Sequence, residues 1–148
     1  LEIKDETQSL QSCVSGSVTK NELRVGNWLY VDDMVNNHII SSIRETMVNV
    51  EYIRIDTNEP HCSLISVDRL KPIKLTEKLL LNFGWELDYE TDDFKEYINY
   101  KLDIDSINYV PSKDIFYFNC WENTKCPQSI HQLQNLYFSL TGRELTDR

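Results

Sequence analysis

The chain has 148 residues, of which 41% are hydrophobic and 26% charged. It is long enough for one domain with its own core, and this composition excludes a disordered chain. Its 24 Asp+Glu against 15 Lys+Arg give a formal net charge of −9, which repels a nucleic-acid backbone unless basic residues gather on one face. No apolar run approaches the ~20 residues that span a bilayer. We therefore expect an acidic, cytoplasmic protein that does not enter a membrane.

The N-terminal part of the chain predicts a tail followed by short strands. Residues 1–20 mix polar residues with scattered apolar ones and are expected to form a flexible tail. Beyond it, β-branched and aromatic runs separated by turn residues predict strands at 28–31, 38–44, 47–55 and 63–67. Neither face of the 47–55 strand is purely polar, so both faces are expected to be partly covered. This spacing indicates a small twisted antiparallel sheet or an SH3-like barrel.

The middle of the chain predicts a short helix and then an antiparallel meander. Thr76 is suited to cap a helix, and Gly84 is suited to end it after Phe83. Strands are predicted at 85–89, 94–102, 106–110 and 114–121. The run Ile115–Phe118 is the most apolar of these, and we expect it to lie in the centre of the sheet.

A closing amphipathic helix is predicted over 129–141. Ser129 and Gln132 have the spacing of a capping box, and Gly142 is suited to end the helix. An apolar stripe runs along it, formed by Ile130, Leu133, Leu136, Tyr137 and Leu140. The whole pattern predicts an α+β fold in which residues 21–148 form a single domain, with sub-lobes at about 21–70 and 71–148.

Candidate binding residues lie on this closing helix. His131, Gln134 and Asn135 bring polar groups into an otherwise apolar element. They could present a recognition face, or they could hydrogen-bond neighbouring loops within the fold, which is the commoner use of such groups. They are the binding residues that the sequence nominates.

Metal binding and catalysis find little support in the residue pattern. His61, Cys62, Cys120, Cys126 and His131 offer nitrogen and sulfur ligands, but no CxxC pair is present and the spacing is unlike that of zinc sites. A nucleophilic Cys62 or Cys120 would need a histidine beside it in space, and no local signature selects one. The residues therefore favour a non-enzymatic protein without metal or cofactor, and leave a small cysteine-dependent enzyme as an alternative.

One local concentration of basic residues offers a second alternative. Arg69, Lys71, Lys74 and Lys78 follow one another closely, interrupted by Glu77. As a contact strip they would suit a nucleic-acid-associated accessory protein. The net charge opposes that interpretation, so a nucleic-acid partner is not expected.

Three segments of the chain carry a family resemblance. They read NELRVGNWLY at 21–30, KPIKLTEKLLLNFGW at 71–85 and SIHQLQNLYFSLTGREL at 129–145. In this order they resemble the "GNWV/Y", "PIPLTEExLLKFGF" and "VHQLQNLYFALTGEEL" motifs of short uncharacterised proteins encoded in bacterial prophages and mobile elements. Lys74 stands where that group more often has Pro, and Ile130 where it more often has Val. The resemblance implies a phage-associated context and carries no activity or catalytic residues with it.

These observations together favour one function. We expect a non-enzymatic protein-interaction module of phage or mobile-element origin, which acts through a protein partner or through self-association.

Overall fold

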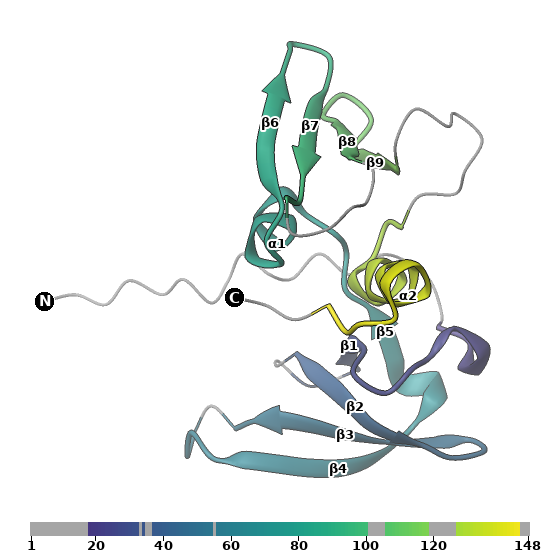
Figure 1. Cartoon of the computed structure of the whole chain (residues 1–148). Helices are drawn as coiled ribbons and strands as arrows, with labels where there is room; N and C mark the ends of the chain where they lie inside the picture. The colour runs from purple at the N-terminus through teal and green to yellow at the C-terminus, as the bar shows by residue number, and fades with distance from the viewer. Residues whose placement is uncertain are drawn as a thin grey trace, which may run out of the picture. The chain divides into compact units, whose positions relative to one another are not determined.

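The computed structural model describes residues 18–32, 34, 37–54, 56–100, 106–118 and 127–145. Nearly all of the expected tail, up to residue 17, lies outside this part, as do Cys13, Cys120 and Cys126. The chain is α+β, as its sequence predicts, and it divides into two compact units between Lys74 and Leu75. Figure 1 shows the elements of both units.

The N-terminal unit is built on one antiparallel sheet. Its strands are β1 (Trp28–Val31), β2 (His38–Ile43), β3 (Met47–Ile53), β4 (Pro60–Ser66) and β5 (Leu70–Pro72). They lie in the order β4-β3-β2-β1-β5, and a 3-10 turn at Val67–Arg69 connects β4 to β5. A closed barrel would require β4 to pair with β5, and the described strands do not pair in this way. Of the two predicted shapes, the open sheet is the one found.

One face of this sheet forms the core of the unit. Val48 and Val50 of β3 are fully buried and pack in a cluster with Ile40 of β2 and Ile65 of β4. The opposite face of β3 is less covered than predicted, because Glu51 and Ile53 are exposed while only its first two outward residues are half-buried. Residues alternate between faces along a strand, so the sheet has one core face and one outer face.

The C-terminal unit combines a second sheet with two helices. Its elements are α1 (Glu77–Asn82), β6 (Glu86–Glu90), β7 (Lys95–Ile98), β8 (Ile107–Val110), β9 (Ile115–Phe118) and α2 (Ile130–Thr141). The strands form an antiparallel sheet in the order β6-β7-β8-β9. The prediction that Ile115–Phe118 lies centrally is wrong, since β9 is an edge strand.

Local signals set the ends of both helices. The Thr76 hydroxyl accepts a hydrogen bond from the Leu79 N–H (3.2 Å), as the predicted cap requires. Gly142 ends α2 in the left-handed conformation, with a φ of 68°, which glycine adopts without a Cβ penalty. Within the described residues, neither helix combines the length and the apolar character needed to cross a bilayer.

Candidate functional site

The three polar residues nominated on the closing helix lie largely inside the structure. His131 and Gln134 are buried, and Asn135 is half-buried. The Ser129 hydroxyl lies 3.0 Å from His131 Nδ1, so these two side chains share a hydrogen bond. This placement agrees with hydrogen bonding within the fold, which is the commoner use of such groups. Their binding role stays a prediction.

A residue that the sequence did not single out, Gln128, organises the start of α2. Its side-chain amide donates to the Phe116 carbonyl (2.9 Å) and accepts from the Phe116 N–H (3.3 Å). Its carbonyl accepts from the Leu75 N–H (2.9 Å), and its N–H donates to Gln132 Oε1 (3.0 Å). The predicted capping box is therefore wrong. Ser129 is the N-cap residue but makes no side-chain cap bond, and the Gln132 side chain accepts from the N–H of Gln128 instead of that of Ser129.

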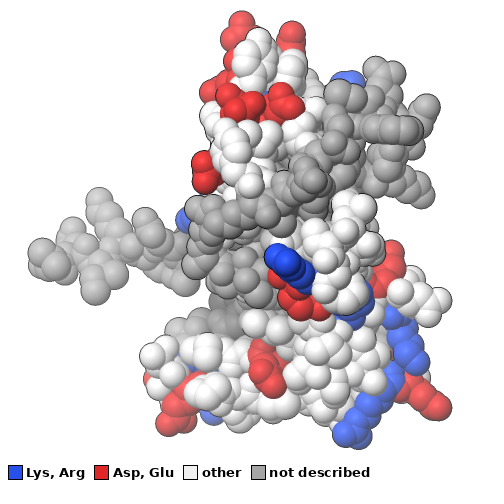
Figure 2. Space-filling model, viewed as in Figure 1, with Lys and Arg blue, Asp and Glu red and all other residues white. Residues whose placement is uncertain are grey.

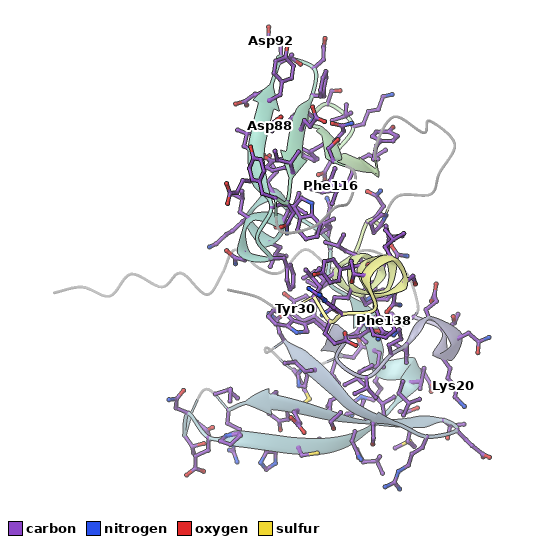
Figure 3. All side chains as sticks on the ribbon, viewed as in Figure 1. Lys20, Tyr30, Asp88, Asp92, Phe116 and Phe138 are labelled. Carbon is purple, nitrogen blue, oxygen red and sulfur yellow. The ribbon has the colours of Figure 1, made fainter. Side chains whose placement is uncertain are left out.

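The Gln128 amide also explains why β9 can lie at an edge. An edge strand leaves main-chain N–H and C=O groups without a strand to bond them. At the middle of β9 the Gln128 amide meets both main-chain groups of Phe116, as a neighbouring strand would. The Phe116 side chain, labelled in Figure 3, is buried. An apolar strand is thus accommodated at the edge by one side chain.

A cluster of ionisable groups links α1 to β7. Lys95 Nζ lies 3.0 Å from Glu77 Oε2 and 3.4 Å from Glu90 Oε1, and the Tyr97 hydroxyl donates to the same Glu77 oxygen. The hydrogen bond to Glu77 raises the pKa of Lys95. Burial, followed by the bond to Glu77, raises the pKa of Tyr97 well above its ordinary value. The Glu77 charge is compensated here, which suits a structural tie between helix and sheet.

The predicted basic strip is divided by the fold. Arg69 and Lys71 belong to the N-terminal unit and Lys78 to the C-terminal unit. Arg69 donates to the Asp32 carbonyl (2.9 Å), and Lys71 Nζ lies 3.6 Å from a carboxylate oxygen of Asp32. An acidic neighbour thus offsets part of the charge that phosphates would need.

Cys62 is exposed on the outer face of β4. His61 precedes it in the strand, and adjacent residues of a strand point to opposite faces. His61 contacts Tyr52, which in turn contacts the buried His38, with ring centroids 5.5 Å and 4.7 Å apart. These two histidines therefore lie on the face away from Cys62. Among the described residues no group of three His, Cys, Asp or Glu side chains could hold a metal ion.

The strand that carries Cys62 forms one edge of its sheet. β3 pairs with β4 on one side, and no described strand pairs with β4 on the other. The β3–β4 ladder runs through seven directly opposed residue pairs without a bulge. None of the seven residues of β4 carries a formal charge with histidine neutral. Figure 1 shows β4 as a long strand along the lower rim of the N-terminal unit, and Figure 2 shows that rim mainly in white, with charged side chains toward its ends.

The hydrogen-bond pattern of this ladder shows which main-chain groups face outward. At the turn between the strands, the Arg54 N–H donates to the Glu59 carbonyl (3.0 Å). At the opposite end, the Val67 N–H donates to the Thr46 carbonyl (3.1 Å), so both bonds involve an odd-numbered residue on the β4 side. Bonded and non-bonded pairs alternate in an antiparallel ladder. The odd-numbered residues of β4 therefore bond to β3. The N–H groups of Cys62, Leu64 and Ser66 point away from it.

The outer face beside this edge is partly apolar. Ile39, Ile53 and Leu64 are exposed on it, on three neighbouring strands. The pairings Ile39↔Glu51 and Glu51↔Cys62 place Ile39, Glu51 and Cys62 in one row across the sheet. Leu64 and Ile53 lie in the next rows of the outer face, one on either side of it. Glu51 is the only charged residue in the row. An exposed apolar face that continues to an unprotected edge is typical of an interaction surface.

The acidic character of the chain is concentrated outside this surface. Residues 18–74 carry seven Lys+Arg and eight Asp+Glu, whereas residues 75–148 carry seven and thirteen. Many of the acidic residues of the second unit lie on the β6–β7 hairpin, where Asp88 and Asp92 are labelled in Figure 3. Residues 18–74 are thus close to neutral, with a formal net charge of −1 (7 minus 8), and the repulsion that they contribute at β4 is weak.

Comparison of the chain with family models, with curated proteins and with solved structures finds no match. The candidate site therefore rests on its own geometry, which is an uncharged, bulge-free strand edge bordered by an apolar face.

Proposed function

We propose that this protein is a non-enzymatic interaction module of phage or mobile-element origin, which binds an extended protein segment as an additional strand along β4. The outward N–H groups of Cys62, Leu64 and Ser66 carry the proposal. Strand addition takes its affinity from such main-chain groups and its specificity from alternate side chains. Folded proteins usually protect a long edge with lysines, prolines, bulges or a covering element. On β4, only the first residue, Pro60, belongs to that set.

A protein segment suits this edge better than a nucleic acid does. β4 offers no positive charge for a phosphate. Elsewhere in the unit, the Asp32 carboxylate offsets the charge of Lys71, and the Asp32 carbonyl accepts a hydrogen bond from Arg69. An extended polypeptide would instead bond to the strand and place alternate side chains beside Leu64 on the apolar outer face. The cysteine-dependent enzyme remains the less favoured alternative, because the face of β4 that presents Cys62 is opposite to the face that carries His61.

The phage or mobile-element origin is proposed from the resemblance of the three segments described above. Gene order tests it independently of binding. Neighbouring genes for integration, packaging or virion proteins would support this origin. A conserved housekeeping neighbourhood would count against it.

Site-specific photocrosslinking tests the binding surface. A photoreactive phenylalanine analogue is placed at Leu64 on β4 or, as a matched control, at Leu81 on α1; the native side chains are 49% and 46% exposed. After irradiation in the cells that carry the gene, we expect covalent protein adducts from position 64 and none from position 81. Equal yields at both positions, or no adduct at position 64, would refute binding at β4.

A second variant separates the edge from the side chain. Cys62→Pro removes one outward N–H, and the bonds that join β4 to β3 stay in place. Combined with the analogue at position 64, this variant should lose most of the adduct. Unchanged adduct formation would mean that the main chain of β4 takes no part.

A further inference from the structure

We infer that the segment added to β4 is β4 of a second copy of this chain, so that the two copies join their sheets across a two-fold axis. This inference rests on the function proposed above and specifies its partner. It follows from the main-chain groups of β4: when the strand is paired antiparallel with a second β4, the outward donors of each copy meet acceptors of the other.

The antiparallel register with the greatest overlap centres the two-fold axis on Ser63. In this register Cys62 lies opposite Leu64 of the second copy, and Leu64 lies opposite Cys62 of the second copy. Both residues present their N–H and C=O groups outward, so each of these pairs can exchange two hydrogen bonds. At the ends, the Ser66 N–H meets the carbonyl of Pro60, which has no N–H to leave unpaired. No outward donor of the strand lacks an acceptor.

The side chains also favour this pairing. Like charges placed directly opposite each other destabilise neighbouring strands, and β4 brings none. The Cys62 and Leu64 side chains face one another across the new ladder. The apolar outer faces, with Ile53 on the neighbouring strand β3, become continuous between the copies.

The charge distribution supports a second copy over another acidic or basic segment. A charged peptide would find no charge of opposite sign on β4. Two copies of a chain with a net charge of −9 repel each other on average. Here the near neutrality of residues 18–74 lets the β4 edges approach, while the acidic β6 edge, with Glu86, Asp88 and Glu90, disfavours pairing of that strand with itself.

Sedimentation equilibrium of the full chain measures the association directly. We expect a reversible dimer whose dissociation constant rises by about 30-fold in Leu64→Pro, because two symmetry-related N–H donors are lost at about 1 kcal/mol each. Leu64→Lys keeps these donors but sets a charge in the ladder of each copy, and should also weaken the dimer. Ile39→Lys, on the same face but two strands from the edge, is the matched control and should leave the dissociation constant within about threefold.

A disulfide reports the register. The background carries Cys13→Ser, Cys120→Ser and Cys126→Ser, and Leu64→Cys is added to it. Opposed residues of a bonded pair lie about 5.5 Å apart between Cα atoms, within the range of disulfides. Mild oxidation should then join Cys62 of one copy to the cysteine introduced at position 64 of the other. The background with Leu64 retained should stay uncrosslinked, because Cys62 and its own copy lie diagonally, at a greater separation.

The results separate this inference from the proposed function. A dimer that responds to Leu64→Pro and cross-links at position 64 supports the inference. A chain that is monomeric at every concentration, while position 64 photocrosslinks a different protein, overturns it and leaves strand addition standing. The inference is also overturned if neither Leu64 variant changes the dissociation constant of the dimer, or if Ile39→Lys raises it as much as they do. Absence of any adduct and of any dimer refutes both proposals.

Discussion

Replacing Gln128 by alanine removes the side chain that completes the edge of the second sheet. Two hydrogen bonds disappear, one to the N–H and one to the carbonyl of Phe116. A hydrogen bond contributes about 0.5–1.5 kcal/mol net, and an unsatisfied buried group costs about 1–3 kcal/mol. Because Phe116 is buried, we expect Gln128→Ala to lower the free energy of unfolding of the C-terminal unit by about 2–3 kcal/mol.

Amide hydrogen exchange measures the loss of the Gln128 bonds at Phe116. The Phe116 N–H should exchange markedly faster in Gln128→Ala, and urea unfolding followed by circular dichroism should give the loss in free energy. Gln132→Ala is the matched control, since it removes one bond from a more exposed glutamine and should cost about 0.5–1 kcal/mol. If exchange at Phe116 is unchanged and both variants unfold alike, the role assigned to Gln128 is refuted.

Three further predictions concern other local features. Thr76→Ala should lower the free energy of unfolding by about 1 kcal/mol, because the cap bond to the Leu79 N–H is lost, and urea unfolding measures it; an unchanged midpoint would contradict the cap. Gly142→Ala should cost about 1 kcal/mol through backbone strain alone, since no atom lies within 4 Å of the added Cβ, and Gly142→Asn should cost less in the same assay. The raised pKa of Tyr97 favours its protonated form in the folded state, so its contribution to stability is complete below the ordinary value of 10.0 and is lost as the pH rises above it. Tyr97→Phe should therefore be less stable at neutral pH and lose less stability above pH 10, and parallel pH profiles for the two proteins would contradict this.

Local features of the fold were predictable because neighbours in the sequence produce them. The Thr76 cap depends on residues three positions apart, and the Gly142 end of α2 depends on the φ freedom of one residue. The alternation along 47–55 identified two faces, and Val48 and Val50 are indeed buried together on one of them. Such signals need no knowledge of distant contacts.

The errors arise where a distant partner decides the outcome. Ile115–Phe118 is apolar enough for a central strand, but the Gln128 side chain provides the neighbour on one side and leaves the strand at the edge. The capping-box spacing of Ser129 and Gln132 is present, yet Gln132 bonds the N–H of Gln128 and the Ser129 hydroxyl meets His131. β4 begins at Pro60, three residues before the strand predicted at 63–67, because β3 offers it a partner along its whole length.

In the candidate binding surface too, some features are set by the local sequence and others by distant contacts. The residues of β4 alone determine that the strand is uncharged and that Cys62 and Leu64 share a face. Only the tertiary structure places β4 at an edge and sets the phase of its ladder with β3. That phase directs the N–H groups of Cys62 and Leu64 outward, because hydrogen bonds to β3 occupy the alternate residues. Strand order and register depend on pairings between segments far apart in the chain, which no local pattern specifies.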